Sequence, residues 1–287
     1  MSSTAKYRIV KLASGAHSVH SLAHAETFHP VVGPVAEAEA LYVRQLRLPE
    51  RLRGHAGEFV VWDVGLGAAA NVLTVLRATR DVGGALRLVS FDHTLEPLEF
   101  ALDHTAHLEY LKGYEAHLRR LVGDRSVTFD EGALHVQWEV HVADFPTLIA
   151  QPAAERFAPP HAVMFDAFSP AKNPTMWSQP LFANLFRRLD PDRPCALPTY
   201  SRSTMLRVTL LLAGFFVGVG HATGEKEETT IAANNLALIA EPLDRRWLQR
   251  ARRSTSAEPM WEPVYRQAPL APETWEKLQQ HPQFPPG

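Results

Sequence analysis

The stretch Phe59-Val-Val-Trp-Asp-Val-Gly-Leu-Gly67 decides the fold. Its apolar half is typical of a buried strand, and the glycines after Asp63 allow a sharp turn into a helix. A second junction, Ala162-Val-Met-Phe-Asp166, also ends an apolar run with a carboxylate. In an open parallel sheet, ligands bind at the carboxyl ends of the strands. The two junctions therefore predict a cofactor pocket with a substrate-facing acid beside it.

Strands and helices alternate along the middle of the chain, which favours a parallel sheet with helices on both faces. Two β-rich runs, residues 215–221 and 229–240, have no helix between them and predict an antiparallel hairpin at the end of that sheet. The pattern predicts strands over residues 59–64, 85–91, 134–142, 162–165 and 195–200, and helices over residues 69–79, 95–122, 180–188 and 203–213.

The two ends of the chain differ from this middle part. Residues 7–12 and 18–22 predict a small hairpin, and residues 34–48 have helical character. Beyond Glu241 the chain is rich in Pro, Arg and Trp without a clear period. We therefore expect an N-terminal hairpin and helix packed on the core (1–48), a main domain (49–241) and an irregular C-terminal extension (242–287).

The composition is that of a folded soluble protein, with 287 residues, 46% hydrophobic and 21% charged. We see no signal peptide and no apolar stretch long enough to span a bilayer, so we expect a cytoplasmic protein. The single cysteine, Cys195, excludes an internal disulfide and a multi-cysteine zinc site, and we expect no metal. A net charge of −2 does not favour nucleic-acid binding, although 29 Lys and Arg residues leave room for a local basic patch.

Three acids close successive strands. Asp63 precedes Gly65 and Gly67, whose flexibility lets the backbone approach a nucleoside ligand closely. Asp92 follows the next strand at the spacing typical of an acid that binds a ribose diol, and Asp144 could accept from an adenine amino group. Each acid alone could be a helix cap, and the glycine turn alone a plain β–α connection. Acids at three neighbouring strand ends would face one crevice.

This arrangement resembles the class I S-adenosylmethionine-dependent methyltransferases, which share the strand order and the antiparallel final hairpin. The stretch Asp166-Ala-Phe-Ser-Pro-Ala-Lys-Asn-Pro-Thr-Met-Trp177 narrows the resemblance, because it is similar to the D-[AG]-F-[AS]-P-x-K-N-P-x-M-W signature of the MnmC-type tRNA methyltransferases. Glu26-Thr-Phe-His-Pro-Val-Val-Gly33, followed by Glu37, resembles a further segment of the single-domain members, and Pro198-Thr-Tyr-Ser201 another.

The resemblance implies an S-adenosyl-L-methionine-dependent N-methyltransferase that acts on tRNA. The acceptor would be the aminomethyl group of the wobble uridine, 5-aminomethyl-2-thiouridine. Two motifs depart from the family: its F-G-T-G turn is Leu66-Gly-Ala-Ala here, and its basic G-x-K-R-E-M stretch is Gly224-Glu-Lys-Glu-Glu-Thr229. If that stretch meets tRNA, Glu227 replaces an attraction for phosphate with a repulsion. The length left over cannot hold the FAD-binding oxidase half, and we expect the form without it.

Methyl transfer to an amine needs strict alignment more than acid–base help, and Asp166 is our candidate to orient the amine and stabilise its growing charge. By resemblance Glu37 would reach the methionyl amino group, although Glu39 is an alternative. The remaining expected cofactor-binding residues are Asp63, Gly65, Gly67, Asp92 and Asp144. The expected substrate-binding residues are His29, Phe168, Lys172, Trp177 and Lys226.

Several of these residues could instead have a purely structural role. Trp177 could simply pack in the core, Lys172 could be a solvated loop charge, and His29 could make a loop hydrogen bond. Three other functions also stay open. They are a small-molecule amine methyltransferase of the same fold, an NAD(P)-dependent oxidoreductase and a non-catalytic binding module. The dinucleotide-binding turn of an oxidoreductase typically has a third glycine, which this turn lacks.

Overall fold

The computed structural model describes residues 6–224 and 227–285. The chain forms two compact units. The first comprises Met1–Phe145, Ala162–Asp166 and Ala222–Glu227, and the second comprises Pro146–His161, Ala167–His221 and Glu228–Gly287. The domain boundaries expected at residues 48 and 241 stay a prediction.

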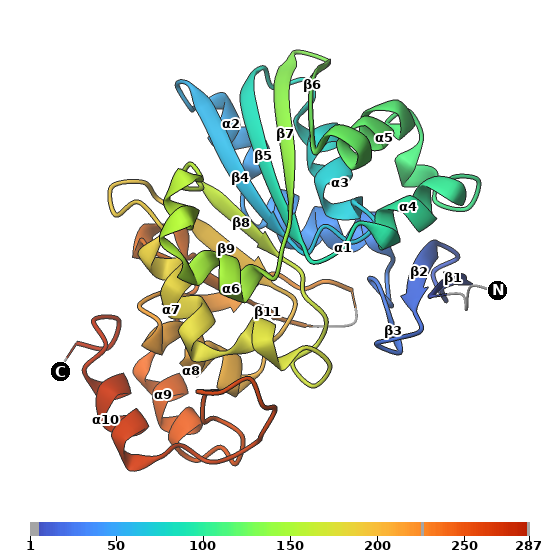
Figure 1. The fold of residues 1–287 in the computed structure, drawn as a ribbon. Coiled ribbons are helices and arrows are strands. Elements are labelled where there is room, and N and C mark those ends of the chain that lie inside the picture. Colours follow the sequence, from blue (N-terminus) through green and yellow to red (C-terminus); the bar gives the residue numbers. More distant parts are fainter. Residues whose placement is uncertain (1–5, 225–226, 286–287) are drawn as a thin grey trace. The chain divides into compact units, whose positions relative to one another are not determined.

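In the first unit, five neighbouring strands run in the order β8-β4-β5-β7-β6 (Figure 1). The pairs β8–β4, β4–β5 and β5–β7 are parallel, and β6 pairs antiparallel with β7. The central strands are almost entirely buried, as expected of parallel strands covered on both faces. These strands are β4 (Glu58–Val64), β5 (Gly84–Asp92), β6 (Ser126–Glu131), β7 (Leu134–Val142) and β8 (Ala162–Phe165).

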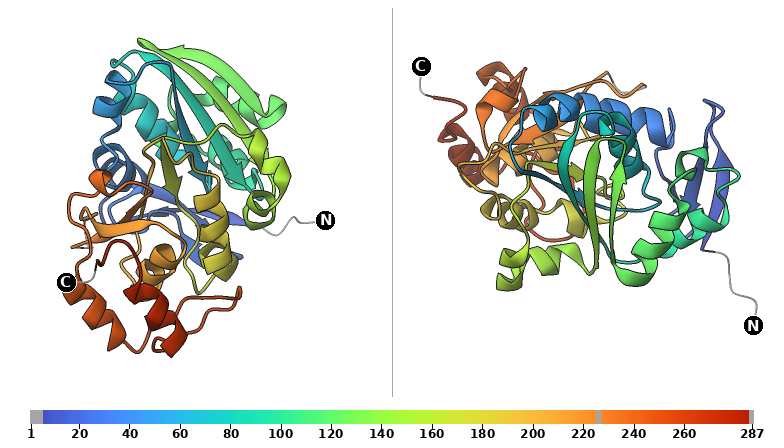
Figure 2. Two further views of the ribbon diagram at one scale, coloured as in Figure 1. Left: turned by 90° about the vertical axis from the view of Figure 1, so that its left-hand side faces the viewer. Right: turned by 90° about the horizontal axis from the view of Figure 1, so that it is seen from above.

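The strands at the N-terminus form a separate antiparallel sheet, in the order β1-β2-β3 (Figures 1 and 2). They are β1 (Tyr7–Lys11), β2 (His17–Ser21) and β3 (Glu26–Thr27). The hairpin expected at the N-terminus is confirmed, and a short third strand extends it.

Helices connect these strands. Helix α3 follows the glycine turn and packs against α1 and α2. The first unit contains α1 (Pro34–Ala38), a π-helical turn (Glu39–Arg44), α2 (Leu48–Arg53), α3 (Ala70–Thr79), α4 (Glu96–Asp103), a 3-10 turn (Glu109–Leu111) and α5 (Glu115–Asp124).

The second unit has three antiparallel strands in the order β10-β11-β9. The hairpin of β10 and β11 predicted from the sequence is confirmed. The strands are β9 (Ala196–Thr199), β10 (Phe216–Gly220) and β11 (Thr229–Ala233). The helices of the second unit are α7 (Gln179–Arg187), α8 (Thr204–Leu212), α9 (Arg245–Arg252) and α10 (Pro272–Gln279). Its 3-10 turns are Pro152–Arg156, Pro174–Trp177 and Leu236–Leu238. Helix α6 (Phe145–Ala150) belongs to the second unit except for its first residue, Phe145, which is assigned to the first.

Four predictions from the sequence were wrong. The helix expected over residues 95–122 is interrupted: α4 ends at Asp103, where His104 has a φ of −123°, and Gly113, with a φ of +91°, lies just before α5. The helix expected over residues 34–48 also breaks, where Arg47 adopts a φ of +52°. Strand β6 was missed, and α9 and α10 replace the irregular tail. No helix in the described part of the chain is long and apolar enough to cross a membrane.

The end of the chain is anchored on β10. The side-chain amide of Gln283 accepts a hydrogen bond from the Val217 backbone N–H at 2.7 Å and donates to the Val217 carbonyl at 2.7 Å. It thereby satisfies backbone groups as a neighbouring strand would. The ring of His281 lies between Phe216 and Phe284, with centroids 6.0 Å from each. Burial lowers the pKa of His281 to about 4.

This pKa predicts an acid-sensitive anchor. The unfolded chain binds a proton at His281 below about pH 6.5 and the folded chain only near pH 4, so stability is complete above pH 6.5 and is lost as the pH falls between these values. We expect a contribution on the order of 1–3 kcal/mol. Chemical denaturation of His281→Phe, which retains the ring contacts, should show a flatter pH dependence over this range than the native protein. Equal slopes would contradict the assignment.

Candidate active site

Acidic side chains gather at the strand ends of the first unit. Asp63 lies in β4, Asp92 ends β5, Asp144 follows β7 and Asp166 follows β8. Burial raises the pKa of Asp63 to about 7, a hydrogen bond from Ser90 opposes this, and the charges of Asp166 and Asp92 add to it. Asp63, Asp92 and Asp166 therefore lie within reach of one another's charges, and the roles expected for these acids stay a prediction.

Asp63 has one satisfied and one open oxygen. The Ser90 hydroxyl donates to its Oδ2 at 2.8 Å and in turn accepts from the Trp138 indole N–H at 2.9 Å. Its Oδ1 is buried and has no hydrogen-bond partner among the described residues. A buried acceptor without a donor is costly, so a ligand donor would be bound favourably there.

The glycine turn is held against Asp92. Gly67, with a φ of +52°, donates its backbone N–H to Asp92 Oδ2 at 2.9 Å. The ring of Phe28 covers this turn, and a Cβ at position 67 would lie 3.1 Å from the ring. Gly65, with a φ of +96°, donates to the Phe91 carbonyl at 2.9 Å. The backbone thus follows a path that other residues adopt only with strain.

Asp92 and Asp144 both raise the pKa of His93. His93 Nδ1 lies 3.0 Å from Asp92 Oδ1. The hydrogen bond to Asp92 raises the pKa of His93 against the effect of burial, and the charges of Asp92, Glu96 and Asp144 add to this rise. Asp144 therefore belongs to the same electrostatic environment as Asp92.

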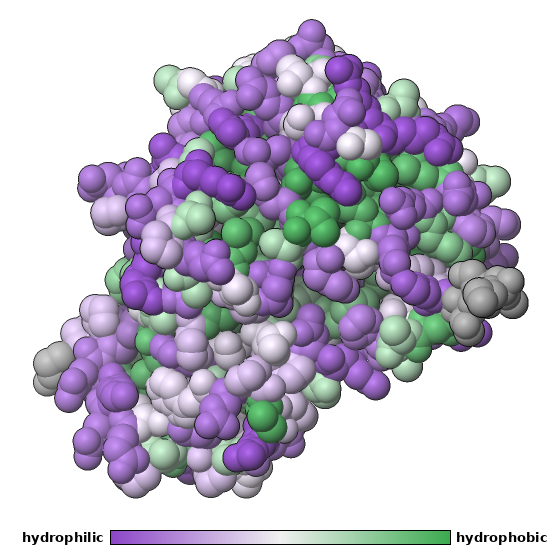
Figure 3. Space-filling model, viewed as in Figure 1, coloured by the Kyte–Doolittle hydropathy of each residue, from purple (hydrophilic) through white to green (hydrophobic). Residues whose placement is uncertain are grey.

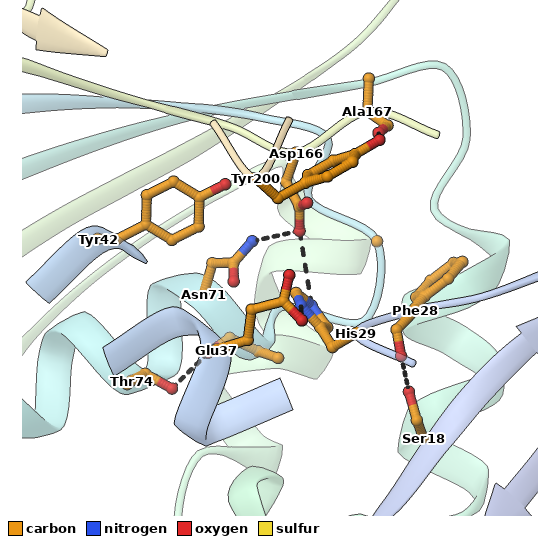
Figure 4. Close-up of polar contacts among 12 residues, drawn as sticks. Ser18, Phe28, His29, Glu37, Tyr42, Asn71, Thr74, Asp166, Ala167 and Tyr200 are labelled. Carbon is orange, nitrogen blue, oxygen red and sulfur yellow. Dashed lines mark hydrogen bonds and ion pairs between the residues drawn. The ribbon is translucent and has the colours of Figure 1, made fainter. Parts of the chain in front are cut away.

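Asp166 is fixed by its surroundings (Figure 4). Its backbone N–H donates to the Val64 carbonyl at 2.9 Å, which prolongs the pairing of β8 with β4. The Tyr42 hydroxyl donates to the Phe165 carbonyl at 3.1 Å, immediately before it. The Asn71 amide donates to Asp166 Oδ2 at 2.8 Å. The carboxylate therefore has a defined orientation.

His29 lies between two carboxylates (Figure 4). Its Nε2 is 3.5 Å from Asp166 Oδ2, and its Nδ1 is 3.9 Å from Glu37 Oε2. The side chains of His29, Glu37 and Asp166 are 8%, 12% and 18% exposed, so all three are largely shielded from water. His29 also has a φ of +47°, an uncommon backbone conformation for a residue with a side chain.

Sequence reasoning missed Asn71 and Tyr42. Asn71 is on the first turn of α3, directly after the glycine turn, and a polar residue in that apolar helix was the available signal. Tyr42 looked like one more apolar position of a helix. Its contact joins residues 123 positions apart in sequence, which local patterns do not reveal.

The signature loop of the second unit is built around Trp177. This side chain is 1% exposed, its indole N–H donates to the Phe168 carbonyl at 2.7 Å, and its ring meets the edge of Tyr200 at 5.8 Å. The Tyr200 hydroxyl donates to the Ala167 carbonyl at 3.0 Å. This burial favours the packing role for Trp177 over stacking on a base. Phe168 is half-buried.

Two lysines, Lys172 and Lys226, were expected to bind the substrate. Lys172 is exposed. Lys226 lies outside the described residues. Within the described ranges, no group of three or more His, Cys, Asp or Glu side chains is arranged to hold a metal ion.

Comparison with known proteins identifies relatives of the chain. Residues 107–235 match a family of S-adenosyl-L-methionine-dependent methyltransferases. The chain is 29% identical over 234 residues to the tRNA 5-methylaminomethyl-2-thiouridine biosynthesis bifunctional protein MnmC of Methylibium petroleiphilum, covering 77% of this chain and 34% of that protein. It is 28% identical to the protein of the same name from Ralstonia nicotianae, covering 82% of this chain and 34% of that protein. The chain thus spans about a third of the length of these relatives.

The fold has a solved counterpart. The crystal structure of MnmC2 from Aquifex aeolicus superposes with a TM-score of 0.66 at 20% identity, covering 98% of this chain and 84% of that one. This likeness confirms the mixed α/β fold expected from the sequence. The family match does not favour the nicotinamide-dependent alternative. Over residues 107–235 the chain matches the model of an S-adenosyl-L-methionine-dependent methyltransferase family, and its resemblance to the MnmC-type proteins is confirmed.

Proposed function

We propose that the chain transfers a methyl group from S-adenosyl-L-methionine to the aminomethyl nitrogen of the wobble uridine in tRNA. The family match supports the methyl donor, and the printed names of the relatives point to the thiouridine of tRNA. The observation that carries the proposal is the carboxylate of Asp166, oriented by Asn71 beside the other strand-end acids. A tRNA substrate would place the activity in the cytoplasm.

The residues present fit the cofactor. At the positive-φ turn, Gly65 carries no side chain and is suited to the close approach of a nucleoside, while the Phe28 ring covers Gly67. We assign Asp92 to the ribose hydroxyls and Asp144 to the adenine amino group. Asp63 Oδ1, buried without a partner among the described residues, is suited to a donor from the cofactor or a bound water.

When bound, S-adenosyl-L-methionine supplies a methyl group on a positively charged sulfur. The acceptor nitrogen attacks with its lone pair, the bond between methyl carbon and sulfur breaks, and the product amine carries a positive charge. We assign Asp166 to hold the neutral amine in line and to stabilise the charge that develops. Because Asn71 occupies Oδ2, Asp166 Oδ1 is the oxygen that can accept from the amine.

His29 and Glu37 extend this assignment. The charged product amine must lose a proton before the site is reset, and Asp166 is its nearest assigned acceptor. His29, 3.5 Å from Asp166 and 3.9 Å from Glu37, is placed to take that proton onward. This use of Glu37 differs from the contact with the methionyl amino group implied by the family resemblance.

The experiment that tests the proposal is mass analysis of tRNA nucleosides from a strain that lacks this chain. We expect aminomethyl-uridine to accumulate at the expense of its methylated form, and the purified chain with S-adenosyl-L-methionine to convert that tRNA. Unchanged nucleosides, together with methylation of small amines by the purified chain, would favour the small-molecule alternative instead.

Removing the Asp166 carboxylate should separate chemistry from cofactor binding. For Asp166→Ala we expect kcat to fall at least roughly 100-fold, because stabilisation of the developing charge is lost. The dissociation constant of S-adenosyl-L-methionine, measured by calorimetry, should stay within about two-fold. Asn71→Ala should lower kcat by a smaller factor, since the carboxylate remains but is no longer oriented. Turnover equal to the native protein in both variants would remove the pair from the mechanism.

Asp92 should affect cofactor binding, in contrast to Asp166. We expect Asp92→Ala to weaken S-adenosyl-L-methionine binding about 10- to 100-fold, the effect of losing hydrogen bonds to a charged group. Asp103→Ala, which removes an exposed acid at the end of α4, is the matched control and should bind normally. Calorimetry that finds the same affinity in Asp92→Ala and Asp103→Ala would refute the ribose assignment.

A further inference from the structure

Helix α9 carries an arginine face that its packing does not use. Its inner side buries Trp247, Leu248 and Ala251. Arg246, Arg250 and Arg253 follow at i, i+4 and i+7, so they share the outward face, and all three are exposed. They span about 10 Å along the helix axis.

Other arginines of this segment have structural partners. Arg245 donates to the carbonyl of Phe284 at 3.1 Å, and Arg252 lies 4.9 Å from the centroid of the Trp275 ring. By contrast, the guanidinium groups of Arg246, Arg250 and Arg253 make no hydrogen bond or ion pair within residues 6–224 and 227–285. The outward face therefore has no evident role in holding the second unit together.

The positive charge continues beyond α9. Arg207 is buried in α8, where it donates to the Thr229 carbonyl at 2.8 Å and lies 3.2 Å from Glu228. Burial lowers the pKa of Arg207 and Glu228 opposes this, but the positive charges of Arg202 and Arg250 lower it further. Arg202 and Arg250 are thus close enough to Arg207 to repel it. Glu228 is paired with Arg207.

The surface over this region is polar. In the space-filling view, mostly hydrophilic residues cover α9 and α10 at the lower left (Figure 3). Like charges held together without counter-ions repel one another, and a partner of opposite charge removes that cost. Arginine suits phosphate in particular, because its planar fork donates two hydrogen bonds to one phosphate group.

We propose that Arg246, Arg250 and Arg253 form a basic strip that binds the phosphate backbone of the RNA substrate. This inference rests on the proposed function and adds the surface by which that substrate is held. It also accounts for a departure noted in the sequence, where Glu227 stands in place of an arginine of the resembling family's basic stretch. The α9 face supplies positive charge that this stretch lacks.

The test measures binding of an unmodified tRNA transcript to the full chain by fluorescence anisotropy at several salt concentrations, without cofactor. In Arg246→Gln/Arg250→Gln/Arg253→Gln we expect the dissociation constant near 0.1 M salt to rise about 10- to 100-fold. The slope of log affinity against log salt should fall by about 2 to 3, one for each lost phosphate contact.

The matched control is Arg119→Gln/Arg120→Gln/Arg125→Gln, which removes the same charge from exposed positions in and after α5. Its affinity and slope should match the native protein. If the α9 triple variant loses its circular dichroism melting transition, Arg246→Glu/Arg253→Glu replaces it, because this variant leaves unchanged Arg250, whose charge acts on the buried Arg207.

Equal affinity and equal slope in the α9 variant and the native chain would overturn the strip. Native binding of tRNA without salt dependence would also overturn it, because phosphate contacts by arginine release counterions. Failure of the proposed function is a separate result: the native chain would then methylate no tRNA, whatever the α9 variant does to binding.

Discussion

Repulsion between carboxylates is the constraint on which the first unit depends. Asp63, Asp92 and Asp166 are held within reach of one another's charges at neighbouring strand ends, where water offers little screening. Each is offset by a specific donor: Ser90 for Asp63, the Gly67 N–H for Asp92, and Asn71 for Asp166. Such a cluster is poor for stability and useful for binding, because a cationic ligand relieves the repulsion.

The two units concentrate charges of opposite sign. The first unit gathers negative charge, which suits the positively charged sulfur of the methyl donor and the positive charge that forms on an amine. The second unit exposes positive charge on α9, which suits a phosphate backbone. A net charge of −2 for the whole chain hides this division. The overall charge is therefore a weak guide to what either surface binds.

Much of the fold could be predicted from the sequence because its signals are local. Apolar runs ended by Asp63 and Asp166 identify β4 and β8, and the glycine turn identifies the start of α3. The tail could not be predicted in this way. Helix α9 buries only Trp247, Leu248 and Ala251 among many arginines, so its apolar stripe is too narrow to stand out. Its start depends on the Asp244 side chain, which accepts from the Trp247 N–H at 2.7 Å.

The candidate site likewise has a part with local sequence signals and a part that depends on long-range contacts. Acids at strand ends can be predicted from the sequence, because the ends of apolar runs can be recognised there. The groups that orient these acids cannot be predicted in this way, because Asn71 and Asp166 are 95 residues apart and meet only after the strands pair. The burial of Trp177 is a further case, since an aromatic residue in a loop motif has the same sequence signal whether it stacks on a ligand or fills the core.

A crystal structure of the chain with S-adenosyl-L-homocysteine would test the central claim most directly. We predict that the ribose hydroxyls bind the Asp92 carboxylate and that the sulfur faces Asp166, with the Asn71 hydrogen bond retained. A ligand bound elsewhere, or a sulfur turned away from Asp166, would contradict the account.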